Sequence, residues 1–435
     1  MTRRIAVIGS GVAGLGVAHL LKHDAQVTLF EAGDHFGGHA HTVDVTLEGV
    51  THGVDTGFLV FNHRTYPHLL ALFDELKVQT APSDMSFSVQ SREHGLEWSG
   101  SNLDSVFAQR RNLLRPAFLR MLAEVVRFNK LATAIAERGQ ERELDEDIGS
   151  FLDRHGFGQV FRQWYFLPMI GCIWSCPTDQ MLRFPVATMI RFCHNHGLIQ
   201  VTDRPQWHTV AGGSRNYVRK IVAGLADARL RAPVRAVRRD DQGVSVSTDA
   251  GTERFDEVVL ACHTDQSLAL LQDAGDEERA VLGAIRYQAN RTVLHTDTSL
   301  LPSRRRAWAA WNYEHVPGPR EQAHVCLHYL INRLQPLPFR QSVIVSLNPW
   351  REPAPGTVLG QWEVDHPVFD RTAIDAQQRL PALQGRARTW YAGAWTRYGF
   401  HEDGLMSAHA VAQAMRARAR GTPAAAAGVA EAVPA

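Results

Sequence analysis

Apolar and polar positions in the first thirty residues follow the pattern of a strand, a helix and a second strand. Residues 5–8 form an apolar run of the kind found in buried parallel strands. A glycine-rich turn follows, and then a helical segment over residues 13–23. A second strand over residues 26–30 ends at Glu31. This order predicts a βαβ unit, and with it an α/β fold that contains a parallel sheet.

Strand and helix patterns alternate over longer stretches further along the chain. Residues 81–96 alternate polar and apolar positions in places, which favours strands, whereas residues 103–138 have a helical pattern rich in arginine. A charged connector at 139–147 leads into an aromatic, mostly helical stretch at 151–198, and no internal repeat is present. We expect further strands over 232–239, 243–248, 257–262 and 389–395, a β-rich stretch over 291–365, a closing helix over 404–419, and a disordered tail over 421–435.

The composition is that of a large globular protein. Of the 435 residues, 45% are hydrophobic, which excludes global disorder, and the length favours two domains. Lys and Arg number 46 and Asp and Glu 45, and this balance argues against a nucleic-acid-binding protein. The chain has no apolar run of about 18 residues and no signal-peptide pattern at its start. The five cysteines are most simply reduced thiols, so we expect a cytoplasmic protein.

A dinucleotide-binding motif lies between the first strand and the first helix. Its G-x-G-x-x-G pattern supplies a tight turn, a close approach of the backbone to a pyrophosphate, and close helix–strand packing. The helix N-terminus offers free N–H groups to phosphates. Glu31 stands where a carboxylate accepts hydrogen bonds from both ribose hydroxyls and disfavours the 2′-phosphate of NADP. A glycine-rich turn without a ligand is the structural alternative. The predicted contacts are made by Gly9, Gly11, Val12, Ala13, Gly14 and Glu31.

The stretch that follows the second strand resembles another flavoprotein signature. Ala32 is followed by Gly37, Gly38 and His39, similar to the E-x-x-x-x-x-G-G signature of the superfamily that holds flavin amine oxidases, protoporphyrinogen oxidases and carotenoid desaturases. The resemblance implies that the paired glycines pass the backbone close to the phosphates of FAD. Members of the superfamily often carry Arg where this chain has His39.

Two other groups of residues point to different chemistry. His35, His39 and His41 form either a polar loop or part of a metal site, but no cysteine or carboxylate cluster completes a site, so we predict no metal. Cys172 and Cys176 suggest a flavin-disulfide enzyme. Such enzymes place their cysteine pair just after the first FAD motif. Here the pair lies far downstream, with three residues between the thiols, so we expect packed, reduced cysteines.

Three further segments resemble the same superfamily. Residues 54–58 resemble a short motif beside the flavin, and Val234 lies in a region that resembles the strand whose valine backbone contacts adenine. The C-terminal segment resembles the terminal A-G-[DE] motif, although Ala394 stands at the position of the acid. The helix that follows should direct its N-terminus, near Leu405 and Met406, at the flavin O2 and N1. The residues so implied are Gly57, Phe58, Val234, Gly393, Ala394, Gly404, Leu405 and Met406.

The resemblance extends from residue 5 to about residue 415 and implies a two-domain fold. We expect a discontinuous Rossmann-like domain, built from residues 1–60, 205–285 and 385–420, that binds FAD without a covalent bond. A mixed α+β substrate domain, built from residues 61–204 and 286–384, should place a β-sheet over the flavin.

The middle of the chain resembles a narrower group. Segments 308–313, 332–335, 346–349, 361–367 and 400–403 are similar to a bacterial family of predicted NAD/FAD-binding flavoproteins. That family is associated with cyclopropane-fatty-acid-synthase-like methyltransferases and with desaturation of methylated fatty acyl chains. A reductase fed by NAD(P)H usually needs a second nucleotide site, but the sequence has no second G-x-G-x-x-G. An oxidase or a desaturase is therefore the leading class.

The candidate catalytic residues are Arg291, His295, His401 and Glu402. In amine oxidases a lysine near flavin N5 lies on a strand that roughly matches residues 290–295, and this chain has Arg291 there. The resemblance therefore does not support lysine-assisted amine chemistry. Desaturation removes a hydride and a proton, and the base is expected among His295, His401 and Glu402, each of which is equally suited to a structural hydrogen bond.

Composition points to the substrate and its partners. The aromatic stretch between residues 157 and 199 suits a hydrophobic tunnel or ordinary core. Residues 110–127 interleave arginines with apolar residues, as in a basic amphipathic helix broken near Pro116 or in a solvated surface helix. We expect dehydrogenation of a methyl-branched unsaturated fatty acyl or phospholipid chain, with reoxidation by oxygen or a redox partner. The protein should lie at the inner membrane surface beside a lipid methyltransferase and bind no nucleic acid. A small-amine oxidase and a non-catalytic flavoprotein partner of the methyltransferase are the alternatives.

Overall fold

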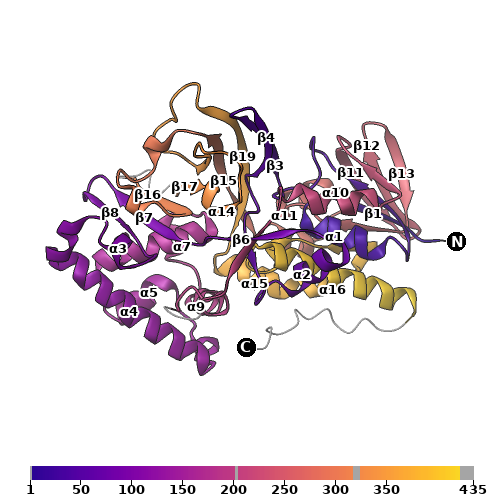
Figure 1. The fold of residues 1–435 in the computed structure, drawn as a ribbon. Coiled ribbons are helices and arrows are strands. Elements are labelled where there is room, and N and C mark those ends of the chain that lie inside the picture. Colours follow the sequence, from indigo (N-terminus) through magenta and orange to yellow (C-terminus); the bar gives the residue numbers. More distant parts are fainter. Residues whose placement is uncertain (1, 201–203, 317–323, 422–435) are drawn as a thin grey trace.

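A parallel sheet forms around the N-terminal strand. In the computed structural model, which describes residues 2–200, 204–316 and 324–421, β1 (Arg4–Ile8) lies between β2 (Gln26–Phe30) and β14 (Glu257–Leu260). All neighbours in this sheet are parallel, in the order β10-β2-β1-β14-β20. Its outer strands are β10 (Asp227–Arg229) and β20 (Thr389–Tyr391). We call this half of the molecule the parallel-sheet lobe (Figure 1).

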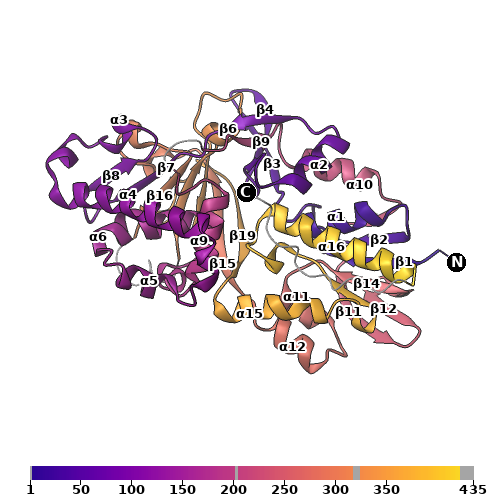
Figure 2. The same cartoon turned by 90° about the horizontal axis from the view of Figure 1, so that it is seen from below.

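Alternate residues of β1 face two hydrophobic cores. Ile5 and Val7 pack on the side of α1 and α16, whereas Ala6 and Ile8 pack on the side of the antiparallel sheet β11-β12-β13 and the helices α12 and α15. Because both faces are covered, the strands are continuously apolar. Figure 2 shows α1 and α16 lying together over this sheet. The bounds are α1 (Val12–Leu21), α10 (Arg215–Ala223), α11 (Thr264–Leu270), α12 (Asp276–Leu282), α15 (Arg371–Arg379), α16 (His401–Ala419), β11 (Val234–Asp240), β12 (Gly243–Thr248) and β13 (Gly251–Phe255).

The second half, the mixed-sheet lobe, is built on seven strands in the order β19-β15-β18-β17-β16-β7-β8. Only β16 and β7 pair in parallel. The long strand β19 lies at the junction of the two lobes, and β8 lies at the far edge (Figures 1 and 2). The strands are β7 (Phe87–Ser91), β8 (Leu96–Ser99), β15 (Arg286–His295), β16 (Trp311–His315), β17 (Cys326–Leu330), β18 (Ile344–Leu347) and β19 (Val358–Val368).

Helices from the middle of the chain pack beside this sheet. They include the aromatic stretch, whose large side chains are core residues: Phe161, Phe166 and Phe184 are buried. The structure therefore places this stretch in ordinary core. The helices are α3 (Leu103–Val106), η1 (Arg110–Leu114), α4 (Pro116–Glu137), α5 (Ile148–Arg154), α6 (Gln159–Phe161), η3 (Arg162–Phe166), α7 (Leu167–Trp174), α8 (Thr178–Met181) and α9 (Val186–Asn195).

Asp55 joins the two lobes. It ends β4 (Val50–Asp55), which pairs with β3 (Thr42–Leu47), and its buried carboxylate accepts hydrogen bonds from the Ser214 backbone N–H at 2.9 Å and from the Gln335 side chain at 2.7 Å. A small sheet, β5-β9-β6, adds a second link. Its strands are β5 (Phe61–Asn62), β6 (Thr80–Ser83) and β9 (Trp207–Val210).

The fold agrees with the expected class, a parallel-sheet unit plus a second sheet unit. All five parallel strands lie within the three segments expected for the FAD-binding domain, although its exact boundaries stay a prediction. The expected helix break near residue 116 is present, because α4 begins at Pro116. Beyond residue 421 the predicted tail lies outside the described residues. No helix among the described residues combines the length and apolar character needed to cross a membrane.

Candidate functional site

Backbone contacts shape the loop that follows β1. Gly9 has φ +100°, and a Cβ there would lie 2.7 Å from the Ala261 carbonyl oxygen. A Cβ on Gly14 would lie 1.9 Å from the Gly9 carbonyl oxygen. Both positions therefore require glycine to bring the helix close to the sheet, as the sequence motif predicts.

Gly11 differs from these two glycines because it faces open space. It is the N-cap residue of α1, with φ −60°, and a Cβ built on it would meet no atom within 4 Å. It has no side chain to cap the helix, so the N–H groups of the first turn, which begins at Val12 and Ala13, are available to a ligand. The loop thus combines free N–H donors with room for an anion.

Glu31 is held beside this loop at the end of β2. Its Oε2 accepts hydrogen bonds from the Ser10 N–H at 2.9 Å and from the Ser10 hydroxyl at 2.5 Å, and its Oε1 accepts from the Gly33 N–H at 2.8 Å. Oε2 already accepts two hydrogen bonds, so Oε1 is the oxygen that keeps acceptor capacity for a ribose hydroxyl. The Ala232 N–H donates to the Glu31 carbonyl at 2.8 Å, which ties the segment just before β11 to the end of β2.

We predict that Glu31→Ala weakens FAD binding by about 1–3 kcal/mol, because the ribose hydroxyls are left short of an acceptor. Titration of apoprotein with FAD, followed by flavin fluorescence, measures the change. Urea unfolding of the apoprotein separates this effect from the loss of the Ser10 and Gly33 hydrogen bonds. Glu31→Gln keeps one acceptor oxygen and should retain part of the affinity. Equal FAD affinity of Glu31→Ala and wild type would contradict the assignment.

The second motif lies directly on the first loop. The Gly37 N–H donates to the Ser10 carbonyl at 3.1 Å, and a Cβ on Gly38 would lie 3.1 Å from Gly11 Cα. Both paired glycines have positive φ, +121° and +56°. Ala32 is exposed beside them. The paired glycines therefore bring their backbone to the same space that Gly11 faces.

The segment at residues 54–58 and the C-terminal segment pack around the N-terminus of α1 as well. The Phe58 N–H donates to the His39 carbonyl at 2.7 Å, and a Cβ on Gly57 would lie 2.3 Å from that oxygen. A Cβ on Gly404 would lie 2.6 Å from Val12 Cγ1 and 3.7 Å from the Ala394 nitrogen. Gly393 is tied to the same helix, because its N–H donates to the Ser407 hydroxyl at 3.0 Å. Segments from both ends of the chain thus meet at the N-terminus of α1.

The start of the last helix corrects one expectation. α16 begins at His401, three residues before the predicted start, because the Phe400 N–H donates to the Asp403 carboxylate and closes a capping turn. Leu405 and Met406 lie in the second turn, so their N–H groups are not the free ones. The free N–H end of the helix dipole lies at residues 401–403.

A buried donor tests whether these residues fit FAD. His39 Nε2 is buried and has no hydrogen-bond partner among the described residues. Burial lowers the pKa of His39 to about 4, so the imidazole is neutral at pH 7, and the charge of Asp365 opposes this effect without reversing it. In its Nε2–H tautomer this imidazole offers an unused hydrogen bond that a phosphate oxygen would accept. The loop, the carboxylate of Glu31 and this imidazole therefore fit the phosphates and ribose of FAD.

Two residues that the sequence analysis did not single out meet His39 from the other lobe. The His366 ring, on β19, lies 5.3 Å from the His39 ring, and the Asn290 side-chain amide donates to His366 Nδ1 at 2.9 Å. Asn348 donates to the Asn290 oxygen at 2.7 Å and fixes its orientation. Burial lowers the pKa of His366 to about 3. His366 stands in segment 361–367, which carries the narrower family resemblance, and that was its only signal in the sequence.

Of the four catalytic candidates, the structure brings only His401 to the FAD motifs. Its ring stacks on Phe58 with centroids 3.6 Å apart, and its Nε2 lies 3.1 Å from the Tyr217 hydroxyl. Burial lowers the pKa of His401 to about 3, so it is neutral at pH 7. The stacked pair joins the segment at residues 54–58 to the start of α16.

The other three candidates are engaged elsewhere. Arg291 lies on the opposite face of β15 from Asn290 and forms a two-bond ion pair with Glu352 at 2.6 and 2.8 Å. His295 has the same strand parity as Arg291 and is fully buried, where its Nε2 bonds the Ser346 hydroxyl at 2.7 Å. The geometry supports structural roles for both residues, and the predicted catalytic roles are not borne out.

Glu402 is a helix cap. Its carboxylate accepts hydrogen bonds from the backbone N–H groups of His68 at 2.9 Å and Leu69 at 3.1 Å, at the start of α2 (Pro67–Glu75). Satisfying these orphan donors explains why a buried acid stands at this position. A carboxylate occupied in this way is poorly placed to act as a base.

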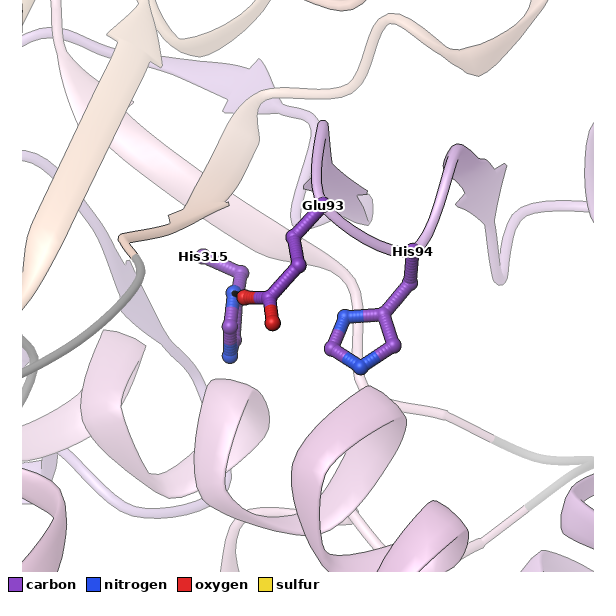
Figure 3. A group of neighbouring side chains, drawn as sticks. All are labelled: Glu93, His94 and His315. Carbon is purple, nitrogen blue, oxygen red and sulfur yellow. Dashed lines mark ion pairs between the residues drawn. The ribbon is translucent and has the colours of Figure 1, made fainter.

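Two groups of metal-ligand-type side chains occur among the described residues, both in the mixed-sheet lobe. Glu314, Cys326 and His328 are buried together, and His328 Nε2 donates to Glu314 at 3.0 Å. Glu93, His94 and His315 point toward one another at the β7–β8 turn (Figure 3). This turn is at the sheet edge opposite β19, so the second group lies away from the FAD motifs. The five cysteines are all free, as predicted.

Comparisons with known proteins agree with this site. The chain matches the sequence model of the family described as flavin containing amine oxidoreductase over residues 12–300. Among solved structures it is similar to a CLA-producing fatty acid isomerase from P. acnes, with 18% identity and a TM-score of 0.67 over 94% of this chain and 98% of that one. It is also similar to a putrescine oxidase bound to putrescine, with 15% identity and a TM-score of 0.65 over 96% of this chain and 100% of that one.

A third similar structure is the cyclohexylamine oxidase from Brevibacterium oxydans, with 15% identity and a TM-score of 0.65 over 96% of this chain and 100% of that one. No curated protein sequence matches the chain. At these identities the solved structures show a shared two-domain fold, while the family match covers most of the chain and includes Glu31, the paired glycines and His39. The chain therefore belongs to the flavin containing amine oxidoreductase family and is an FAD-dependent oxidoreductase.

Proposed function

We propose that the protein dehydrogenates a neutral, hydrophobic substrate, a methyl-branched unsaturated fatty acyl chain of a phospholipid. The observation that carries this proposal is the absence of a formal charge on the imidazoles that meet at the FAD motifs. Burial depresses the pKa values of His39, His366 and His401 to between about 3 and about 4, and Asn290, the partner of His366, is an amide. Neutral imidazoles and an amide offer an ammonium group no ion pair in exchange for its hydration, whereas an alkyl chain requires none.

The residues at the site suit removal of hydrogen from an allylic carbon. FAD, when bound, supplies the oxidant that accepts a hydride equivalent. The chain must also supply a proton acceptor, and His401 is the predicted base that lies with the FAD motifs. Its imidazole is neutral and has one unprotonated ring nitrogen, and its Nε2 lies 3.1 Å from the Tyr217 hydroxyl. A pKa of about 3 makes this imidazole a weak base, which suits it to relay the proton rather than to hold it. Loss of a hydride and a proton from neighbouring positions of an alkene leaves a conjugated diene.

The fold is compatible with acyl substrates, because one of the similar structures is a fatty acid isomerase. Two others are oxidases of putrescine and cyclohexylamine, so an amine oxidase is the competing function. The neutral imidazoles at the FAD motifs favour the acyl chain over the ammonium ion.

Anaerobic rapid mixing of the FAD-loaded protein with substrates tests this proposal. We expect a methyl-branched monounsaturated phospholipid in mixed micelles to bleach the oxidised flavin and to produce diene absorbance. The saturated analogue should do neither, since its C–H bonds are not allylic. Putrescine and cyclohexylamine serve as the amine arm. Bleaching by the amines, with the flavin left oxidised by the unsaturated lipid, would replace the proposal by amine oxidation.

A further inference from the structure

Large apolar side chains are exposed together at the far end of the mixed-sheet lobe. Leu103 is 78% exposed, Leu113 49%, Leu114 87% and Leu119 43%. They belong to α3, η1 and the first turn of α4, which follow one another in the chain. α4 packs against the lobe through its other face, which includes Phe118, so these leucines do not contribute to the core of the lobe. A cluster of leucines at this exposure marks an interaction surface.

Arginines surround these leucines. Arg110, Arg111 and Arg120 come from the same stretch, and α3 packs against η5 (Arg305–Ala307), which adds Arg305 and Arg306. Asp104 pairs with Arg110 and Arg306, which removes part of this charge. Among the residues that the structure describes, no carboxylate forms an ion pair with Arg111, Arg120 or Arg305. The leucine-bearing face therefore carries a net positive charge.

Not every arginine of the predicted basic helix contributes to this face. Arg115 lies over the Trp164 ring at 4.4 Å and donates to the His94 carbonyl at 3.2 Å. Arg127 lies over the Phe157 ring and donates to the His155 carbonyl at 2.8 Å. Arg115 is partly buried, and Arg127, although exposed, is held against the protein by its ring and carbonyl contacts. The structure thus narrows the basic surface to the end of the lobe near α3 and η1.

A pocket of about 660 Å³ opens beside the leucines. Its wall includes Arg92, Arg111, Arg304 and Arg305, with the indole of Trp308 below the Arg305 guanidinium. The carboxylates of Glu97 and Glu314 pair with Arg304 and Arg92, respectively, whereas the Arg111 side chain donates to a backbone carbonyl and Arg305 lies over the indole. Guanidinium groups without carboxylate partners in a pocket of this size suit a phosphate group.

We propose that the face formed by Leu103, Leu113 and Leu114 docks on an anionic lipid bilayer and that the arginine pocket beside it receives a headgroup phosphate. The leucines would enter the headgroup region and the arginines would lie at the level of the phosphates. This inference deepens the proposed function, since a phospholipid substrate resides in such a bilayer. Binding to vesicles does not require turnover, so the two proposals fail separately.

Sedimentation of the FAD-loaded protein with vesicles tests the docking face. Wild type should bind vesicles that contain phosphatidylglycerol and phosphatidylcholine, bind pure phosphatidylcholine weakly, and dissociate as salt is added. In Arg111→Gln/Arg305→Gln, the partition coefficient should fall about 25-fold, since each arginine contributes about fivefold. Leu113→Ser/Leu114→Ser should lower it about tenfold or more even at low salt. Leu230→Ser/Arg238→Gln, which alters an exposed leucine and an exposed arginine on the parallel-sheet lobe, is the matched control and should bind like wild type.

Four results would overturn the docking proposal. One is equal binding of wild type and both double variants, and another is no binding to anionic vesicles at all. The third is a wild-type dimer that the leucine variant converts to a monomer, because the face would then join two copies of this chain. Glycerol phosphate in solution serves as a competitor. If it fills the pocket as tightly as vesicles bind, the pocket recognises a soluble phosphate ester and the bilayer assignment is wrong. If the protein dehydrogenates acyl chains but does not bind vesicles, only the docking proposal fails. If it binds vesicles but does not dehydrogenate acyl chains, only the proposed function fails.

Discussion

Gly11→Val should abolish FAD binding while the apoprotein stays folded. A Cβ at Gly11 meets no protein atom within 4 Å, and its φ of −60° is accessible to any residue. The added side chain would instead occupy the space that we assign to the pyrophosphate, next to the free N–H groups of α1. We expect FAD affinity to fall by roughly a hundredfold or more, which corresponds to about 2.7 kcal/mol.

A matched glycine on the same lobe provides the control for this variant. Gly275 is also an N-cap residue, of α12, with φ −77°, and its Cβ would meet only the Glu278 carboxylate at 3.9 Å. Gly275→Val should therefore carry a similar local cost and leave FAD bound. Circular dichroism checks the fold of both variants, and the flavin-to-protein absorbance ratio reports the cofactor. FAD should raise the melting temperature of wild type and of Gly275→Val but not of Gly11→Val. A yellow Gly11→Val protein would show that the pyrophosphate lies elsewhere.

Acid should unfold the apoprotein steeply below about pH 6.5. Burial holds the pKa values of several histidines well below the ordinary value of 6.5, so these residues are neutral when folded and become protonated when unfolded. Between their folded pKa values and 6.5 the unfolded state binds more protons, and stability is lost as pH falls through that window. The groups concerned are His39, His41, His196 and His295, with pKa values of about 4, and His366 and His401, with values of about 3.

Two buried carboxyl groups act in the opposite direction. Burial raises the pKa of Asp55 to about 6 and that of Asp403 to about 7. The folded state then binds protons that the unfolded state releases, so their contribution to stability grows as pH falls. Six histidines outweigh two carboxyl groups, and we expect a net loss of roughly 6 kcal/mol between pH 6.5 and about pH 5.

Urea unfolding of the apoprotein over this pH range measures the loss directly, without a contribution from FAD binding. His196 stacks on Phe192 with ring centroids 4.0 Å apart, so His196→Phe removes one titrating group and keeps a similar shape. This variant should lose about 1.5 kcal/mol less than wild type between the same two pH values. His23→Gln, at an exposed site, should match the wild-type slope. A stability that is flat or rises toward pH 5 would show that these imidazoles are charged in the folded protein.

Local motifs predicted the backbone geometry of the loop between β1 and α1, for a physical reason. The turn at Gly9, the helix start at Gly11 and the acid at the end of β2 depend on neighbours within about thirty residues. Their geometry is set by backbone sterics and by the length of one βαβ unit, so residue type and spacing are sufficient. The paired glycines follow the same logic, because their positive φ values suit glycine best.

Catalytic residues could not be predicted in this way. Arg291 and Asn290 are neighbours in sequence, yet strand alternation sends them to opposite faces of β15, and the sequence does not say which face meets the other lobe. The start of α16 was misplaced because its capping turn lies at residues 400–403, ahead of the glycine that seemed to mark the beginning. Glu402 was a candidate base in the sequence, but the tertiary structure places the start of α2 against its carboxylate.

The sequence by itself determined the family, the cofactor and the parallel-sheet unit, since these depend on short-range patterns and on a resemblance carried by those same patterns. Only the tertiary structure decided which histidines are neutral, because burial is a property of all the surrounding elements. It also decided that the leucines of residues 103–119 face outward while other apolar residues of α4 face the core, a distinction that depends on what packs against the helix. The pairing of Asn290 with His366 joins strands whose contact residues are 76 positions apart, and long-range strand register of that kind is set only when the whole sheet assembles.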